Sequence, residues 1–191
     1  MLMLFLSICY CYNLFTPVIK MKIPICYFDA KTRTLCPKCL EKFRKGEIGR
    51  LDIDLSHDLI EIEEKYVPSL KNLVFHKAVN IDNKLIFLLV KGSRNIRKRE
   101  WKIIFRKLMK LGYPKIKIIE VENMHDVKKI ISQVISPARI LSISISWYPD
   151  ESYEYRVRVY KKDLKLLSYS PTIIEEAIYK ITNKRIKIIF E

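Results

Sequence analysis

Hydrophobic positions recur along this chain with two different periods, one typical of helices and the other typical of strands. Trp101, Phe105 and Leu108 follow the i, i+4, i+7 spacing of one face of an amphipathic helix. Residues 115–121 (KIKIIEV) instead alternate apolar and charged side chains, as expected of a strand with one buried face. Such patterns predict regular secondary structure from about residue 50 to the end of the chain.

In each half of this region the predicted elements follow the order helix, two strands, helical segments, strand. In the first half we expect a helix that opens near Asp54 or Ser56 and stops at Pro68, strands over 74–81 and 84–90, a short segment over 91–95, a helix that Gly112 ends, and a strand over 115–121. In the second half we expect a helix over 126–135, strands over 140–147 and 155–160, helices over 163–167 and 172–182, and a strand over 185–190.

This recurrence, at a separation of about seventy residues, predicts the architecture better than any single motif does. We therefore expect an α+β protein with two αββααβ modules, at 51–122 and 123–191. A small cysteine-bearing head over 21–50 precedes them.

The first twenty residues are apolar but do not have the features of a signal peptide, since they lack a positive start and a small-residue cleavage site. Ser7, Asn13 and Pro17 interrupt the stretch, which a spanning helix of about twenty apolar residues would not tolerate well. We interpret residues 1–20 as a misassigned or non-native leader ahead of Met21. A membrane anchor and a packed helix are the alternatives.

The chain is strongly basic, with 36 Lys and Arg against 21 Asp and Glu, a formal net charge of +15 and a pI near 9.6. Such an excess indicates a polyanionic partner, although a generally lysine-rich proteome would also produce it. The charge is clustered, because between residues 91 and 117 there are eleven basic residues and one acid, Glu100. The basic residues of this segment are Lys91, Arg94, Arg97, Lys98, Arg99, Lys102, Arg106, Lys107, Lys110, Lys115 and Lys117. This clustering favours nucleic acid over a solvated helix face.

No hydrolase, kinase, P-loop or dinucleotide-binding signature occurs, and four glycines are too few for a phosphate-cradling enzyme loop. We find no nucleophile beside a base and no carboxylate pair that suggests catalysis. The sequence therefore predicts a protein that is not an enzyme and has no small-molecule substrate.

A candidate metal site lies in the head, where Cys26, Asp29, Cys36 and Cys39 have the layout of a two-knuckle zinc site with Asp in place of one cysteine. His57 or His76 could supply the fourth ligand instead. The alternative is a decayed site with free thiols. A structural zinc ion is thus a hypothesis, and the cysteine usage is typical of a reducing, cytoplasmic compartment.

Three stretches resemble the tandem type II KH domains of the archaeal NusA-like transcription factor family. Residues 136–140 (SPARI) are similar to the opening of its second module, and 181–188 (ITNKRIKI) to its final helix-to-strand corner. Residues 90–97 (VKGSRNIR) resemble its GxxG loop, although Val90 and Ser93 stand where the two glycines belong. The head resembles the cysteine-bearing N-terminus of the same family. The likeness covers about residues 22–191.

The resemblance implies an RNA-binding protein of transcription termination or elongation, with single-stranded RNA as ligand and RNA polymerase as a further partner. A KH loop binds RNA through backbone amides and the start of a helix. The corresponding residues of the first module are Lys91, Gly92, Ser93, Arg94, Arg97, Lys98, Lys102 and Arg106. In the second module, residues 169–172 (YSPT) at the loop position carry no glycine and no base, so we expect that module to be mainly structural. The alternative is a protein-interaction module with two degenerate KH domains that docks on an acidic surface of RNA polymerase or a ribonucleoprotein.

Overall fold

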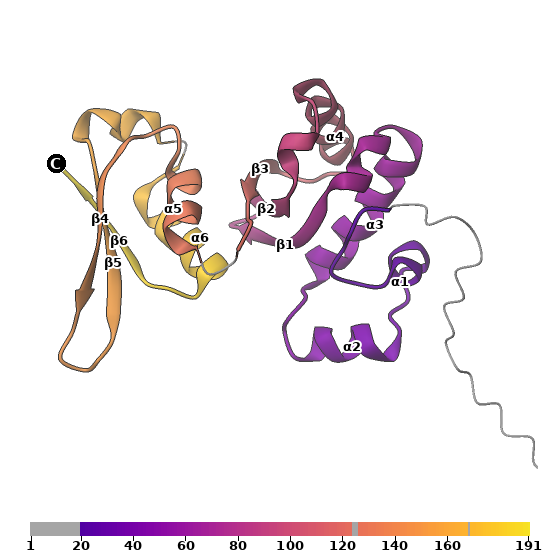
Figure 1. The fold of residues 1–191 in the computed structure, drawn as a ribbon, viewed down its shortest axis with the longest axis horizontal. Coiled ribbons are helices and arrows are strands. Elements are labelled where there is room, and N and C mark those ends of the chain that lie inside the picture. The colour runs from indigo at the N-terminus through magenta and orange to yellow at the C-terminus, as the bar shows by residue number, and fades with distance from the viewer. Residues whose placement is uncertain (1–19, 124–125, 168) are drawn as a thin grey trace, which may run out of the picture.

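The fold is known from a computed structural model that describes residues 20–123, 126–167 and 169–191. Of the leader expected at 1–20, all but Lys20 lies outside these residues. The head contributes two short helices, α1 (Tyr27–Thr32) and α2 (Pro37–Arg44). Two units with the same order of elements follow it (Figure 1).

The elements of the two units agree closely with those predicted from the hydrophobic periods. The first unit contains α3 (Arg50–Lys65), the 3₁₀ turn η1 (Pro68–Asn72), β1 (Val74–Ile81), β2 (Leu85–Lys91), the 3₁₀ turn η2 (Ser93–Asn95), α4 (Lys98–Lys110) and β3 (Lys115–Glu120). The second contains α5 (Val127–Ile135), β4 (Ile140–Trp147), β5 (Tyr153–Val159), the 3₁₀ turn η3 (Lys161–Leu166), α6 (Pro171–Thr182) and β6 (Ile186–Phe190).

The largest difference from the predicted boundaries is at α3, which begins at Arg50 rather than near Asp54 or Ser56. In addition, β5 begins at Tyr153 rather than at residue 155, and the helix expected over 163–167 is the 3₁₀ turn η3. Gly49 occupies the N-cap position, and the Asp52 carboxylate accepts a hydrogen bond from its backbone N–H at 2.7 Å. The other oxygen of Asp52 accepts one from the N–H of Ala78 in β1 at 2.6 Å. Asp52 therefore both caps the start of the helix and ties it to the sheet.

Each unit has a three-stranded sheet with the same topology. In the first, β2 lies in the middle, antiparallel to β1 and parallel to β3. In the second, β5 lies in the middle, antiparallel to β4 and parallel to β6. The protein is thus of mixed α+β type, with one topology used twice.

The helices of the second unit pack on the first sheet. Alternate residues of β2 enter different cores, because successive side chains of a strand point to opposite faces. One face of β2 joins the core built with α3 and α4, through Ile86, Leu88 and Val90. The other face joins the core built with α5 and α6, through Leu85, Phe87 and Leu89. The first sheet is therefore covered on both faces, and α5 and α6 lie between the two sheets (Figure 1).

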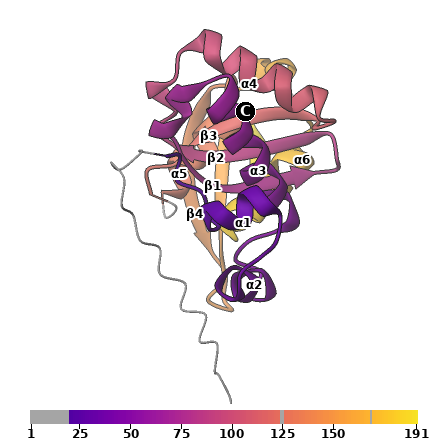
Figure 2. The same ribbon diagram turned by 90° about the vertical axis from the view of Figure 1, so that its right-hand side faces the viewer.

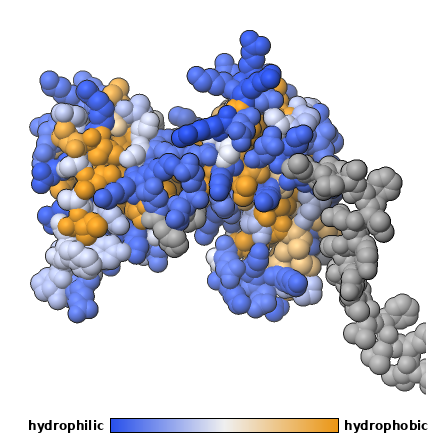
Figure 3. Space-filling view, viewed as in Figure 1, coloured by the Kyte–Doolittle hydropathy of each residue, from blue (hydrophilic) through white to orange (hydrophobic). Residues whose placement is uncertain are grey.

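The second sheet is covered on one face only. Val157 and Val159 of β5 are buried against α5 and α6, whereas Arg156 and Arg158, which alternate with them, are exposed. Trp147, at the end of β4, is 69% exposed. Figure 3 shows hydrophobic residues reaching the surface of this unit, while hydrophilic residues dominate the upper side of the molecule near α4.

The head is attached to the first unit by main-chain hydrogen bonds. Lys22 donates to Leu73 at 3.1 Å and accepts from Phe75 at 2.8 Å, which places it beside the start of β1. Met21 and Ile25 are buried in the first core. Among the described residues, no helix is long and apolar enough to cross a membrane.

Candidate nucleic-acid interface and metal centre

The basic cluster predicted from the sequence is centred on α4, which carries six basic residues and one acid in thirteen positions. Glu100 is used locally, because its carboxylate accepts a hydrogen bond from the N–H of Arg97 at 2.8 Å and caps the helix. Trp101, Ile104 and Leu108 bury the opposite face in the first core. The helix thus presents a charged face to solvent because its apolar face anchors it.

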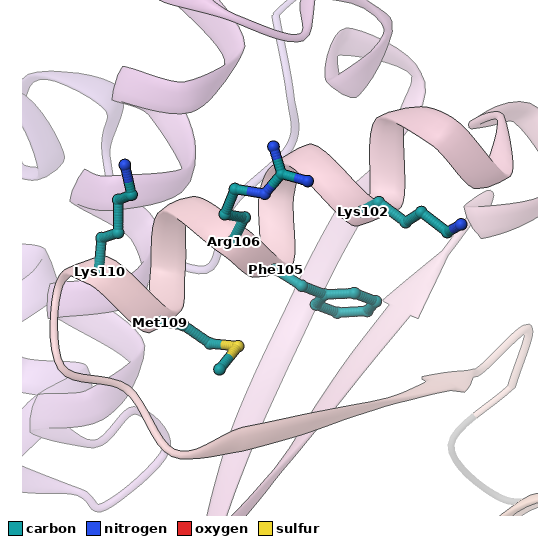
Figure 4. A pocket seen from close by; sticks show the side chains of 5 residues that line it. All are labelled: Lys102, Phe105, Arg106, Met109 and Lys110. Atoms are coloured by element: carbon teal, nitrogen blue, oxygen red, sulfur yellow. The ribbon is translucent and has the colours of Figure 1, made fainter.

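A shallow groove of about 520 Å³ lies along the exposed side of α4. Lys102, Arg106 and Lys110 line it together with two apolar side chains, Phe105 and Met109. Figure 4 shows Phe105 and Met109 on one side of the helix, with Arg106 and Lys110 rising from the other. Met109 is 65% exposed, so its apolar side chain is accessible to a ligand. Apolar surface beside three cations suits a ligand that has flat bases and phosphates.

Trp101 does not belong to this exposed surface. It is buried, it lies 5.7 Å from the Phe105 ring in a stacked arrangement, and its indole N–H donates to the carbonyl of Ser93 at 3.3 Å. The sequence places Trp101 on the apolar face of an amphipathic helix, and in the structure it is part of the first core. Its contact with Ser93 also links α4 to the turn after β2.

The turn after β2 is the predicted phosphate loop, and its backbone amides already have a ligand. Gly92 donates to one oxygen of the Glu120 carboxylate at 2.7 Å, and Ser93 donates to the other at 2.9 Å. Gly92 has φ = +88°, and a Cβ built there would lie 2.7 Å from the carbonyl oxygen of Asn72, so glycine is required. The amides that a phosphate would need are therefore bound to a carboxylate of β3.

The other predicted contact residues near this turn are accessible. Lys91, Arg94, Arg97 and Lys98 are all exposed and lie between the end of β2 and the start of α4. Lys102 and Arg106 follow on α4, where both line the groove. The predicted cations are thus exposed, whereas the Gly92 and Ser93 amides are engaged.

Two lysines of the cluster contact other parts of the chain. Lys117 donates to the carbonyls of Val134 and Ser136, each at 2.8 Å, at the end of α5. Burial, and the charge of Lys115, lower the pKa of Lys117. The ammonium of Lys107 lies 3.4 Å from the centre of the Tyr66 ring. A count of charges along the sequence therefore overstates the cationic surface.

The candidate metal ligands come together as the sequence predicted. Ligand atoms of Cys26, Asp29, Cys36 and Cys39 all lie within 4.8 Å of one another. Cys26 and Cys36 precede the first turns of α1 and α2 respectively, and Asp29 and Cys39 lie within those helices. The N-terminal ends of α1 and α2 thus bring the four ligand atoms close together.

The geometry of this cluster fits a tetrahedral metal site. The sulfurs of Cys26 and Cys36 are 3.8 Å apart. This is the separation expected of two thiolates bound to the same tetrahedral zinc ion, each at about 2.3 Å. The N–H of Cys26 points to the sulfur of Cys39 at 3.3 Å, and the N–H of Cys36 to an Asp29 oxygen at 3.0 Å. Such bonds orient ligands before a metal arrives.

The electrostatics of the cluster differ between its acid and its thiols. Burial raises the pKa of the Cys39 thiol, and a hydrogen bond with Asp29 raises it further. Burial also opposes ionisation of Asp29, but hydrogen bonds from Cys39 and Cys36 outweigh it and lower its pKa. The cluster therefore has a preformed carboxylate and thiols that release protons on binding a cation.

The alternative fourth ligands lie elsewhere. His57 donates a hydrogen bond from Nδ1 to the carbonyl oxygen of Ala30 at 2.7 Å, and it groups with Asp58 and Glu61 on α3 rather than with the cysteines. Burial lowers the pKa of His76, which lies in β1. In the described part of the chain, Asp29 is the fourth member of the cysteine cluster.

Comparison with known proteins does not name a family for this chain. No family model matches it, and no curated protein matches it. One similar solved structure is titled "Crystal structure of APE1850"; it is 14% identical, with a TM-score of 0.44, over 58% of this chain and 80% of that chain.

Proposed function

We propose that this protein binds single-stranded RNA through the exposed face of α4 and the residues between Lys91 and Lys98. The observation that carries the proposal is the groove in which Lys102, Arg106 and Lys110 flank Phe105 and Met109. Lysine and arginine bind phosphates through charge, and flat apolar side chains stack on unpaired bases. No nucleophile or base accompanies the groove, so we propose binding rather than catalysis.

Single strands suit this groove better than duplexes. Bases can reach Phe105 and Met109 only where they are unstacked and unpaired. A duplex would offer α4 its phosphates but not its bases. We therefore propose that the apolar part of the groove distinguishes single strands from double strands.

The finer proposal is that the two units, each predicted as an αββααβ module, are type II KH domains of a NusA-like transcription factor. The recurrence of one sheet topology in both units and the turn with Gly92 at the start of the α4 region support it. The role in termination or elongation, and the cytoplasmic location that goes with it, rest on the sequence resemblance alone.

A second candidate function is the docking of an acidic protein surface, such as one on RNA polymerase. The engagement of the Gly92 and Ser93 amides by Glu120 favours it, because a KH loop with occupied amides has lost its usual contact with RNA. The cations of α4 would then face carboxylates instead of phosphates. The two functions differ in the need for the apolar residues of the groove.

We further propose that the cysteine cluster holds a structural zinc ion. Cys26, Cys36, Cys39 and Asp29 would complete four-coordination, which leaves no position open for substrate. Zinc would cross-link α1 and α2 and would have a structural role rather than a catalytic one. The thiolate-rich ligand set is the reason for proposing zinc rather than magnesium or calcium.

The test of the main function is fluorescence anisotropy of the full chain with a 12-nucleotide single-stranded RNA (a length on the order of the usual single-strand site), across a salt series. Lys102→Glu/Arg106→Glu should abolish binding, whereas Lys84→Glu/Lys128→Glu removes two exposed lysines outside the groove and should weaken it only slightly. Met109→Ser should weaken single-strand binding and leave duplex binding unchanged. Equal affinity for every polyanion, insensitive to Met109→Ser, would favour the acidic protein surface.

A further inference from the structure

A second basic groove lies in the other unit, and no part of the proposed function uses it. It has a volume of about 630 Å³ and is lined by Arg139, Tyr160, Lys161, Lys162 and Glu191. Tyr160, Lys161 and Lys162 are all exposed. The sequence placed the loop of this unit at residues 169–172, where no base occurs, and so did not point to this groove.

Strand pairing shows that this groove is the counterpart of the Gly92 turn. In the first unit Val90 pairs with Glu120, and in the second Val159 pairs with Phe190. The three residues that follow these paired positions of the middle strands are therefore residues 91–93 (KGS) in one unit and residues 160–162 (YKK) in the other. Since Phe190 stands where Glu120 stands, the second unit has no carboxylate at the position that engages the first turn.

The guanidinium of Arg139 is held in place at this groove. Its Nε and Nη2 donate to the two oxygens of Asp163 at 3.0 and 3.3 Å, and its backbone N–H donates to Asp163 at 3.0 Å. Asp163 is buried, so its hydrogen bonds hold the Arg139 side chain in one orientation. The guanidinium lies 5.1 Å from the centre of the Tyr160 ring. An arginine fixed in this way loses little freedom when it binds an anion.

The charges of this groove are not all positive. Glu191 lines it, and its carboxylate lies 3.4 Å from Nε of Arg158. The backbone N–H of Lys161 is bound to the carbonyl of Glu191 at 2.7 Å, so the amide offers nothing to a ligand. What remains is two lysine ammonium groups, the N–H groups of the Arg139 guanidinium that do not bind Asp163, and a tyrosine ring. These groups suit phosphates and an adjacent base, and they suit a peptide carboxylate less because it has no flat ring to place on Tyr160.

We infer that this groove is a second phosphate-binding site for the same nucleic-acid strand that α4 binds. The inference rests on the proposed function for the nature of the ligand. In Figures 1 and 2 both α4 and the turn after β5 lie along the upper side of the molecule, so one strand can approach both from one direction. Two weak sites on one strand bind more tightly together than either does alone.

The experiment compares the full chain with Lys161→Ala/Lys162→Ala on single-stranded RNAs of increasing length, up to about 20 nucleotides, or two sites of the usual size. Each phosphate contact contributes about 0.7 to the slope of log affinity against log salt for a single strand. The double variant should therefore lower that slope by about 1.4 on the longest RNA and leave the shortest RNA unaffected. Glu191→Gln should have the opposite effect and tighten binding, because it removes the one carboxylate that lines the groove.

The control is Lys84→Ala/Lys128→Ala, which removes the same charge from exposed positions outside both grooves. A slope that matches this control overturns the second site. If RNA binding needs Lys102 and Arg106 but does not depend on Lys161 and Lys162, the second site is wrong and the proposed function stands. If binding needs Lys161 and Lys162 but does not depend on Lys102 and Arg106, the α4 proposal is wrong and this groove stands. Inorganic phosphate, a mononucleotide and poly-glutamate serve as competitors. Displacement of the strand from this groove by stoichiometric mononucleotide or by poly-glutamate would contradict a nucleic-acid strand as its ligand.

Discussion

The carboxylate of Glu120 accepts a hydrogen bond from the backbone N–H of Gly92 at 2.7 Å, and this contact closes the one glycine turn that resembles a phosphate loop. The second carboxylate oxygen engages Ser93, so both amides are satisfied within the chain. Gln133 supports the arrangement, because its side chain exchanges two hydrogen bonds of 2.7 Å with the backbone of Glu120. The turn is thus held by an internal anion, and RNA contacts at this corner are left to the side chains around it.

Replacement of Glu120 by glutamine separates the structural from the electrostatic effect of this carboxylate. Glutamine has one acceptor oxygen and no charge, so we expect the free energy of unfolding to fall by about 1–3 kcal/mol. RNA binding should become tighter, because a negative charge leaves the basic surface and one backbone amide becomes free. Urea titration and anisotropy measure the two effects separately.

Glu122→Gln is the matched control for that variant. Glu122 lies two residues further on, is exposed, and pairs with Lys129 at 3.0 Å rather than with the turn. It should leave stability almost unchanged, since exposed ion pairs contribute about 0–1 kcal/mol. Equal stability of the Glu120→Gln and Glu122→Gln variants would show that the turn does not depend on the carboxylate.

The proposed zinc site predicts one zinc ion per chain after purification without added metal. Cys39→Ser should lose the metal and lower the melting temperature, because a structural zinc site contributes directly to folding. Cys11→Ser, which removes a cysteine outside the described residues, should keep the full metal content. Metal analysis and thermal melts with and without chelator decide the question; a full zinc content in Cys39→Ser would rule the cluster out.

The elements of the fold could be predicted from the sequence much more fully than its contacts. Local periodicity placed nearly every helix and strand, because the buried face of an element is determined by its own side chains. The sequence predicted a strand over 84–90, but nothing in that segment says that Phe87 would meet helices from the other half of the chain. Similarly, neither Glu120 nor Lys117 is unusual in sequence. The first became a ligand of the Gly92 turn and the second a donor to α5 only through long-range packing.

The cysteine cluster could be predicted because ligand spacing is itself a local pattern. The groove of the second unit could not, because Arg139 and Tyr160 are brought together by the buried Asp163 and by the pairing of β5 with β6. The assignment of residues 169–172 to the loop followed the order of elements alone. Strand register was needed to identify residues 160–162 as the counterpart of the Gly92 turn.

The ion pair of Arg139 and Asp163 predicts a characteristic dependence of stability on pH. Hydrogen bonds and charge from Arg139 lower the pKa of Asp163 in the folded state. A carboxyl with a lowered folded pKa stabilises the fold above its unfolded pKa of about 4 and loses that contribution as pH falls through the folded value. Wild type should therefore be more stable than Asp163→Asn by a constant amount from pH 7 to about 5, and the difference should shrink below about pH 4. Urea unfolding at several pH values measures this; a difference that persists to the lowest pH would contradict the ion pair.

The burial of β2 on both faces predicts that the two units unfold together. Phe87 is buried in the core that α5 and α6 form, although it belongs to the first sheet, so Phe87→Ala should lower the free energy of unfolding by about 3–5 kcal/mol.

The two tryptophans report on the two units separately, since Trp101 is buried in the first core and Trp147 is exposed on β4. Single-tryptophan variants, Trp101→Phe and Trp147→Phe, allow each to be followed in urea. Because the shared core must break before either unit can unfold, their transitions should coincide, and Phe87→Ala should shift both to the same lower midpoint. Tyr179→Ala, which removes an exposed aromatic side chain of α6, is the control and should shift neither by much. Two separate transitions, with only one displaced by Phe87→Ala, would mean that the units are independent domains and that the packing of α5 and α6 on the first sheet contributes little to folding.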